Sequence, residues 1–456
     1  MADDTRPAQP SPAGSEAGSA PVRDRTAAQH GVRESEAGGL PHACEPAAEP
    51  RGARTGREAS RRIVGVDVAR GLALLGMMAV HILPSTTAAG RMSLPWVLSA
   101  GKSAALFAVV AGVGIALSSG RRRRPEGRIR TASAASLVVR AALIGLVGLL
   151  LGSLVPIQDA ALILPYYAVL FVLAIPLLRL PVRWLVTLAL VIAVVVPVLS
   201  HLVRGGLPDS SGANPALGDL LQAPWRLAAE LTLTGVYPAL PWMAYICIGL
   251  AVGRSRLSRG AVVGLTIAGA ALALAASALS WILLDVAGGR AELAAVAMRS
   301  MSLEEYTDVL VWGADGTLPT TSAWWLAVKA PHTTTPLDLL FTVGVAVAVL
   351  GTALALGQVA GPRLGPLAAA GRMPLTLYAA HVLLLAAPVE PALPWVEYIV
   401  HVTVLVGFAL VWSRWFARGP LEQVLWWATD TVRRAIVGRP GPAAAEQAST
   451  VRPGGR

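Results

Sequence analysis

Residues 61–84 read RRIVGVDVARGLALLGMMAVHILP, and this stretch decides what kind of protein the chain forms. From Ile63 onward it is apolar and long enough to cross a hydrocarbon core of about 30 Å as a helix that rises about 1.5 Å per residue. It nevertheless carries Asp67, Arg70 and His81. Ionisable groups within a span are costly, so they usually face a cavity or a bundle interior and mark a functional site.

The composition extends this interpretation to the whole chain. Hydrophobic residues make up 54% of its 456 residues, charged residues make up 14%, and the mean hydropathy is +0.59. These values exclude an ordinary soluble domain and predict an all-α, polytopic membrane bundle. The net charge of +11 comes from arginines that lie mainly at the ends of apolar runs, so a nucleic-acid partner is not needed to explain it. Cys44 and Cys247 lie in unlike segments and no metal-ligand spacing occurs, so we expect no metal.

Apolar runs and arginine placement predict the topology. Ten runs are long enough to span a bilayer, which predicts about ten transmembrane helices. They lie near residues 63–84, 97–119, 134–154, 161–179, 183–203, 235–253, 260–286, 337–357, 373–389 and 394–415. With a cytoplasmic N-terminus every inner loop is basic, whereas the long outer loops 204–234 and 287–336 are acidic. We therefore expect a multi-pass protein of the plasma membrane with both termini in the cytoplasm.

The chain divides by composition into four parts. Residues 1–60 hold few branched aliphatic or aromatic side chains, which predicts a disordered cytoplasmic tail. The ten spans form one domain over residues 61–416. The sequence of residues 417–436 is typical of an amphipathic helix that lies on the inner membrane surface, and we expect Trp426 and Trp427 at headgroup depth. Residues 437–456 form a second disordered tail.

The three ionisable residues of the first span share one face. Arg70 and His81 are eleven residues apart, which at about 100° per residue leaves them roughly 20° apart around the helix axis. Asp67 precedes Arg70 by three residues and joins the same face. A polar stripe therefore crosses most of the membrane, from Arg70 in the inner half to His81 near the outer interface. The alternative is an ordinary ion pair near the inner interface together with an interfacial histidine.

This stretch resembles the first helix of the transmembrane acyltransferase superfamily, in which an arginine is followed by ten residues and then by a histidine. GVDVARGLALLGMMAVHI is most similar to the opening of bacterial proteins that carry the heparan-alpha-glucosaminide N-acetyltransferase catalytic domain. The resemblance covers roughly residues 60–432. Later segments that fit the same group are LFAVVAGVGIAL, YPALPWMAYICIGLAVGR, HTTTPLD, GRMPLTLYAAH and RGPLE.

The resemblance implies a membrane acyltransferase that moves an acyl group, acetyl above all, from cytoplasmic acyl-CoA to an acceptor at the outer face. It implies His81, Arg70 and Asp67 as the catalytic set, with His81 acting either as a general base or as a nucleophile that carries the acyl group. Arg70 and Arg372 could meet the phosphates of acetyl-CoA. A sugar amine, a cell-wall glycan hydroxyl and a lipid-linked saccharide are all open as acceptors, and so is a homodimer. The excess of Ala, Arg and Gly over Lys indicates a GC-rich bacterial genome, so heparan itself is not expected.

Four further side chains are candidates for ligand binding. Lys102, at a depth similar to that of His81, could neutralise an oxyanion of the bound acyl-CoA or could snorkel to the interface. His332, in an outer loop beside three threonines, is an acceptor-binding candidate or an ordinary loop histidine. Tyr378 and His381 lie one helical turn apart, where they could line the acceptor channel or form an interhelical hydrogen bond.

A protein of another class could use the same buried charges. In an ion-coupled transporter or flippase they would bind the coupling ion, and the histidines would relay protons. The sequence shows no duplicated half with corresponding interrupted spans, which is the usual sign of alternating access.

Overall fold

The computed structural model describes residues 63–121, 124–314, 317–387 and 393–438. The chain divides into two units, residues 1–54 and residues 55–456, and every described residue belongs to the second unit. The predicted tail over residues 1–60 lies outside the described residues, and so does nearly all of the predicted tail over residues 437–456.

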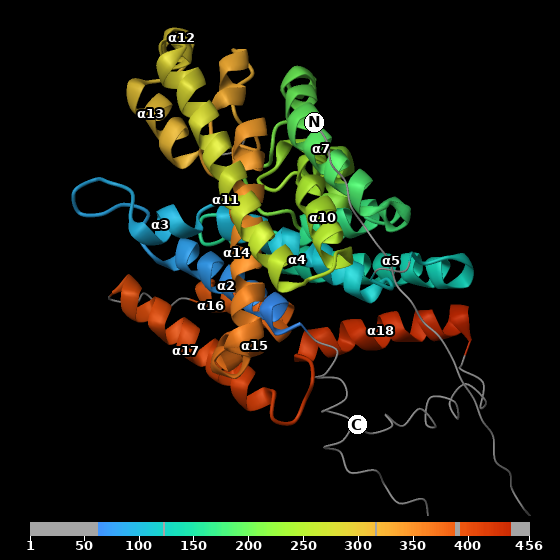
Figure 1. Ribbon diagram of the computed structural model, residues 1–456. Helices are drawn as coiled ribbons and strands as arrows, with labels where there is room; N and C mark the ends of the chain where they lie inside the picture. The colour runs from blue at the N-terminus through green and yellow to red at the C-terminus, as the bar shows by residue number, and fades with distance from the viewer. Residues whose placement is uncertain (1–62, 122–123, 315–316, 388–392, 439–456) are drawn as a thin grey trace, which may run out of the picture. The chain divides into compact units, whose positions relative to one another are not determined.

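The described part of the chain is all-helical, as the sequence predicted, and it contains no β-strand beyond an isolated bridge between Thr86 and Met92. Figure 1 shows the order of the helices. The α-helices are α2 (Val64–Ile82), α3 (Leu94–Ser99), α4 (Lys102–Ser118), α5 (Gly127–Gly152), α6 (Leu164–Leu173), α7 (Val182–Val203), α8 (Asp219–Gln222), α9 (Pro224–Ala229), α10 (Ala239–Arg254), α11 (Arg259–Trp281), α12 (Gly289–Ala297), α13 (Leu303–Trp312), α14 (Pro336–Val359), α15 (Gly365–Arg372), α16 (Pro374–Leu385), α17 (Pro394–Trp412) and α18 (Pro420–Val437). Short 3-10 or π-helical segments are η1 (Pro176–Arg179), η2 (Arg204–Gly206), η3 (Glu230–Thr234), η4 (Ile282–Val286), η5 (Ala323–Ala327) and η6 (Gly361–Leu364).

The count of membrane-spanning helices comes close to ten. Seven helical segments among the described residues are long and apolar enough to cross a membrane, and the number rises to nine if each of two bent helix pairs is one span. The shorter apolar helix α6 lies in another of the predicted runs. A multi-pass membrane protein is therefore confirmed.

The predicted runs at 161–179 and 373–389 are not single continuous helices, and prolines explain both breaks. The run at 161–179 breaks into α6 and η1, with Pro176 at the start of η1. The run at 373–389 contains only the 12-residue helix α16, which joins the preceding helical segment at a 69° bend. The bend falls at Met373, because Pro374 has no N–H to continue the hydrogen-bond ladder and disfavours helical backbone in the residue before it.

Helix α2 lies in contact with α4, α14, α15, α16 and α17, so the span that carries the ionisable stripe is surrounded by other helices. Glycines permit the closest contact between α4 and α10. A Cβ atom at Gly112 would lie 2.5 Å from the carbonyl oxygen of Ile246, so the two backbones touch. Gly112 therefore serves helix packing.

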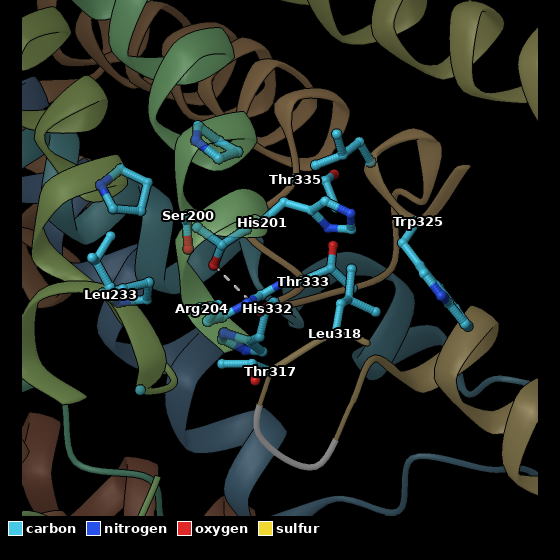
Figure 2. A pocket seen from close by; sticks show the side chains of 16 residues that line it. Ser200, His201, Arg204, Leu233, Thr317, Leu318, Trp325, His332, Thr333 and Thr335 are labelled. Atoms are coloured by element: carbon cyan, nitrogen blue, oxygen red, sulfur yellow. Dashed lines mark hydrogen bonds between the residues drawn. The ribbon is translucent and has the colours of Figure 1, made fainter. Parts of the chain in front are cut away.

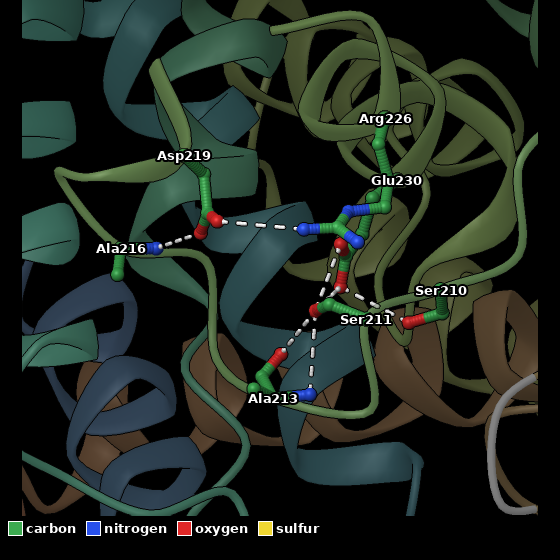
Figure 3. A network of polar contacts seen from close by, with 7 residues as sticks. All are labelled: Ser210, Ser211, Ala213, Ala216, Asp219, Arg226 and Glu230. Carbon is green, nitrogen blue, oxygen red and sulfur yellow. Dashed lines mark hydrogen bonds and ion pairs between the residues drawn. The ribbon is translucent and has the colours of Figure 1, made fainter. Parts of the chain in front are cut away.

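The long loop between α7 and α10 is held by buried polar side chains. The carboxylate of Glu230, which is 3% exposed, accepts hydrogen bonds from the hydroxyls of Ser210 at 3.1 Å and Ser211 at 3.2 Å (Figure 3). The Asn214 side chain accepts a hydrogen bond from Leu162 N at 2.8 Å and donates to the carbonyl of Ala160 at 2.8 Å. These contacts fix the loop against the start of α6.

Candidate functional site

Asp67 and Arg70 form an ion pair on α2, with 2.9 Å between Arg70 Nη1 and Asp67 Oδ1. The same Nη1 also donates a hydrogen bond to the carbonyl oxygen of Gly371 on α15 at 3.0 Å. Only 19% of the Arg70 side chain and 15% of the Asp67 side chain are exposed. The guanidinium therefore links α2 to α15 at a depth where an unpaired charge would be costly.

The approach of α15 to α2 depends on glycine at two positions. A Cβ atom at Gly371 would collide with the carbonyl oxygen of Asp67, and one at Gly71 would collide with the carbonyl oxygen of Leu367. No residue with a side chain fits there without moving a helix backbone. This contact places Arg372, the neighbour of Gly371, beside the Asp67–Arg70 pair.

A cavity of about 550 Å³ opens beside the pair, and we call it the arginine cavity. Its wall comes from α2, α4, α5, α6, α16, α18 and the segments that adjoin them. Four guanidinium groups line it, accompanied by two carboxylates and two phenols. These are the side chains of Arg70, Arg140, Arg372, Arg418, Asp67, Glu422, Tyr167 and Tyr378. The wall is thus basic, and most of its remaining side chains are apolar.

A second cavity, of about 470 Å³, adjoins the arginine cavity. It shares Ser118, Arg140, Arg372, Arg418 and Glu422 with the first. It adds the side chains of Trp426, Arg433, Asp430 and several serines and threonines. Together the two cavities form a basic space that begins beside Arg70 and extends along α18, which lies beside α5 (Figure 1).

Glu422 on α18 fixes the broken end of α16. One carboxylate oxygen accepts hydrogen bonds from the backbone N–H groups of Leu375 at 2.7 Å and Thr376 at 3.1 Å, and the other accepts from the Thr376 hydroxyl at 2.6 Å. These N–H groups belong to the first turn of α16, where no helical partner exists, and the helix dipole favours a negative charge there. The capping contact holds α18 against the bend.

Two histidines meet at the other end of α2. The rings of His81 and of His381 on α16 are stacked, with 5.4 Å between their centroids and 7° between their planes. His81 Nδ1 lies 3.1 Å from His381 Nε2, which is a hydrogen-bonding distance. Arg70 on α2 and Tyr378 on α16 line the arginine cavity, and His81 and His381 on the same two helices form the histidine pair, so both helices contribute to both places.

His401 on α17 extends this pair to three rings. Its ring lies edge-on to that of His381, with 5.4 Å between centroids. His401 Nδ1 lies 3.1 Å from the backbone carbonyl of Glu397, so Nδ1 carries the proton and Nε2 keeps a lone pair.

His332 lies apart from that stack, in the loop before α14. It lines a small cavity of about 20 Å³ together with His201, Arg204 and the threonines that follow it (Figure 2). Its ring is edge-on to Tyr237, with 5.3 Å between centroids, and its Nδ1 has no partner among the described residues. Burial and the charge of Lys102 lower the pKa of His332 from 6.5 to about 4, so the ring is neutral at neutral pH.

The loop around His332 has a strained backbone. His332 and Thr334 adopt φ values of 60° and 53°, a region that is unusual for a histidine and an outlier for a β-branched residue. Hydrogen bonds of the neighbouring residues hold this shape. Thr333 donates to the carbonyl of Ala330 at 2.7 Å, and the N–H of Thr334 donates to the carboxylate of Asp338 at 3.0 Å. Such strain is found most often at ligand-binding sites.

The structure brings only some of the predicted residues together. Arg70, Arg372 and Asp67 share the arginine cavity, but Lys102 lines a different cavity beside Lys329 and Asp338. The three candidates for acceptor binding lie at three places. Tyr378 lines the arginine cavity, where its hydroxyl accepts a hydrogen bond from Ile163 N at 3.3 Å; His381 pairs with His81; and His332 lines the small cavity.

Sequence reasoning missed Arg140, Arg418 and Glu422 as parts of the cavity wall. Arg140 lies in the middle of α5, where an arginine in an apolar helix is itself a sign of a site. The other two lie in or near a helix that was interpreted as lying on the membrane surface.

The chain thus has the helices of a multi-pass membrane protein, and these helices carry ionisable side chains on one enclosed span, a basic cavity and a histidine pair. Residues 62–285 match the family model described as heparan-alpha-glucosaminide N-acetyltransferase, catalytic. This match supports, over residues 62–285, the resemblance to that family of membrane acetyltransferases. The match includes Asp67, Arg70 and His81 and ends before Arg372 and His381. No curated protein matches the chain.

Proposed function

We propose that this protein transfers an acyl group, acetyl above all, from acyl-CoA to an acceptor on the opposite side of the membrane. The observation that carries the proposal is the arrangement of α2. At one end of α2, Arg70 lines a basic cavity. At the other end, His81 pairs with His381. The two residues are separated by a rise of about 16 Å along the helix.

The arginine cavity suits the donor. Acyl-CoA has an anionic nucleotide end and a long, thin pantetheine arm that ends in the thioester. Guanidinium groups bind phosphates through charge-assisted, bidentate hydrogen bonds. We assign the phosphates to Arg140, Arg372 and Arg418, where the two basic cavities adjoin, and the arm to the space beside α2. Asp67 then acts as a positioning residue, because its carboxylate and the Gly371 carbonyl fix Arg70.

The histidine pair suits the transfer step. When His81 Nδ1–H donates to His381 Nε2, His81 Nε2 keeps its lone pair, and the ring is held in one orientation. In direct transfer, Nε2 takes the proton of an acceptor hydroxyl or amine as the acceptor oxygen or nitrogen bonds to the thioester carbon. The C–S bond then breaks, and the proton passes to the departing CoA thiolate. In the alternative, Nε2 bonds to the acyl carbon as the C–S bond breaks and CoA leaves as the thiolate. The acceptor oxygen or nitrogen then bonds to the acyl carbon, the C–Nε2 bond breaks, and Nε2 takes the acceptor proton, which passes to the thiolate.

The arginine-rich loops support a cytoplasmic donor side and an outer acceptor side. On this orientation the acceptor is a glycan, an amino sugar or a lipid-linked saccharide of the cell envelope, and the surrounding lipid belongs to the plasma membrane.

The test uses purified full-length protein in proteoliposomes with labelled acetyl-CoA on the side of Arg70. Methyl α-glucosaminide and methyl α-glucoside serve as amine and hydroxyl acceptors on the other side. We expect His81→Ala to abolish label transfer while the protein stays folded and still binds acetyl-CoA. Full transfer by His81→Ala would refute the assignment of His81. Proton-coupled uptake of a solute without any acyl transfer, lost in Asp67→Asn, would instead indicate a transporter.

A further inference from the structure

The only two lysines of the chain line one cavity. Lys102, at the start of α4, and Lys329, in the loop before α14, face a space of about 490 Å³ that we call the lysine cavity. Both ammonium groups lie near the Phe341 ring, with Nζ at 5.5 Å and 4.0 Å from its centroid respectively. Two like charges around one ring repel each other unless an anion separates or neutralises them.

Neither lysine has a carboxylate partner among the described residues. The ion pairs that involve Asp67, Asp219, Asp285 and Asp430 are all formed with arginines. Lys102 donates one hydrogen bond, to the carbonyl of Ala100 at 3.3 Å. Each ammonium group has three N–H donors, so most of these donors remain available.

The nearest acidic groups are engaged elsewhere. The Asp338 carboxylate also lines the lysine cavity, but it accepts the Thr334 N–H at 3.0 Å and forms no ion pair with either lysine. At the rim, Asp285 is bound by Arg290 through two hydrogen bonds of 2.8 and 3.3 Å. One buried carboxylate therefore faces two ammonium groups, which leaves the cavity positive.

The remaining polar groups of the wall point to the same kind of ligand. The indole N–H of Trp96 is buried and has no acceptor within the described part of the chain. The hydroxyls of Ser280 and Thr342 already donate to backbone carbonyls, at 2.7 and 2.6 Å. The wall thus offers unused donors and few unused acceptors, which is the pattern expected for an oxyanion.

The lysine cavity is connected to the proposed acceptor side. The loop of residues 328–335 contributes Lys329 and Pro331 to its wall and carries His332. The charge of Lys102 also acts on His332. Met92 and Trp281 at the rim are 44% and 59% exposed, so the cavity reaches the surface of the chain.

We infer that the lysine cavity binds an oxyanion, a phosphate or carboxylate, of a saccharide acceptor, with Lys102 and Lys329 as the ligands of the anion. The inference rests on the proposed function in one respect, namely that the bound saccharide is the acceptor. It adds to that function that the acceptor is anionic. The binding site itself requires no acyl transfer, so it can be tested separately.

Amine labelling provides a selective readout, because only two side chains in the protein carry a primary amine. Full-length protein in phosphatidylcholine nanodiscs is treated with trinitrobenzenesulfonate, and each lysine is followed by peptide mass spectrometry. Burial lowers the pKa of Lys329, and a bound oxyanion beside it raises that pKa again. Binding therefore slows labelling both by shielding the amine and by keeping it protonated.

We expect glucose 1-phosphate or glucuronate at ten times its Kd to slow labelling of both lysines roughly ten-fold, and glucose at the same concentration to have no effect. Lys329→Met should weaken the protection of Lys102 about ten-fold or more, and Lys102→Met should do the same for Lys329. Arg299→Gln, which removes an exposed positive charge from the same loop region, should leave protection unchanged.

Other outcomes would overturn the inference. Equal protection by glucose and by the two anionic sugars would show that no oxyanion is recognised. Protection by acetyl-CoA would make this the donor site, and protection by phosphatidylglycerol in the nanodisc without any sugar would assign the lysines to a lipid headgroup. His81→Ala should retain full protection. If acyl transfer is never detected while sugar anions still protect the lysines, the proposed function fails and the anion site stands.

Discussion

His81 and His381 lie 300 residues apart in the chain, yet His81 Nδ1 and His381 Nε2 are 3.1 Å apart and the rings are stacked. This contact fixes the orientation of the proposed reactive ring, because a hydrogen bond to one imidazole nitrogen determines which nitrogen keeps the lone pair.

The first prediction concerns this pair. We expect His381→Phe to lower kcat for acetyl transfer by about 10²-fold, because His81 loses the group that orients it, while KM for acetyl-CoA changes little. His381→Gln, whose amide oxygen can still accept from His81 Nδ1–H, should recover much of the rate. Steady-state kinetics of the two variants tests this prediction. An equal loss of kcat in both would show that His381 does more than accept a hydrogen bond.

The second prediction concerns Arg140, which has no ion pair among the described residues and lines both basic cavities. Arg140→Gln should raise KM for acetyl-CoA about ten-fold, because a charge-assisted contact to phosphate is lost. The exposed Arg179, which lines neither cavity, provides the matched control Arg179→Gln. Similar KM values for the two variants would remove Arg140 from the donor site.

The third prediction concerns the contact between α2 and α15. Gly371→Ala should destabilise the protein by about 1–3 kcal/mol, because the added methyl group collides with the Asp67 carbonyl and pushes the helices apart. Gly365→Ala on the same helix meets no atom within 4 Å and should be close to neutral. Thermal unfolding in detergent measures both. A normal Tm for Gly371→Ala would mean that α15 can shift at little cost.

The fourth prediction concerns the cap on α16. Glu422→Ala should lower stability by about 0.5–2 kcal/mol, because two backbone N–H groups and the Thr376 hydroxyl lose their acceptor. Glu422→Gln keeps an acceptor oxygen and should cost less. Hydrogen exchange at Leu375 and Thr376 is the direct measurement, and unchanged exchange in Glu422→Ala would contradict the capping role.

The fifth prediction is a pH dependence. The pKa of His332 is about 4 in the folded protein and about 6.5 when unfolded, so between these values the unfolded chain binds more protons. Stability should therefore fall as pH decreases from about 6.5 to about 4, by at most about 3 kcal/mol from this residue, and level off below pH 4. The contribution of His332 is the difference in the free energy of unfolding between the wild type and His332→Gln, measured at each pH across this range. Parallel curves would show that His332 is not held neutral.

The sequence predicted those features that depend on local spacing. The alignment of Asp67 with Arg70, the apolar lengths of most spans and the helical character of residues near 420–437 all follow from residues within a few turns of one another.

The features that the sequence did not predict depend on contacts between distant segments. Lys102 was placed near the donor by its depth in the membrane, but depth does not determine which side of the helix bundle a residue faces. His332 is an acceptor-binding candidate because of its outer loop, and Tyr378 and His381 because of their spacing of one helical turn; neither feature determines which cavity a side chain lines. Glu422 caps α16 only because the chain bends at Pro374 and because Glu422 lies on another helix, 46 residues after Thr376. The hydrophobic periodicity of the sequence does not predict such a contact between distant segments.

The dependence of α16 on Glu422 also has a consequence for synthesis of the chain. Ribosomes add residues in order, and α2, with Arg70 and His81, emerges more than 300 residues before the glutamate that completes the opposite wall. A nascent chain that has not reached residue 422 lacks part of the wall of the arginine cavity. The protein therefore passes through most of its translation and membrane insertion with His81 made but the arginine cavity still incomplete.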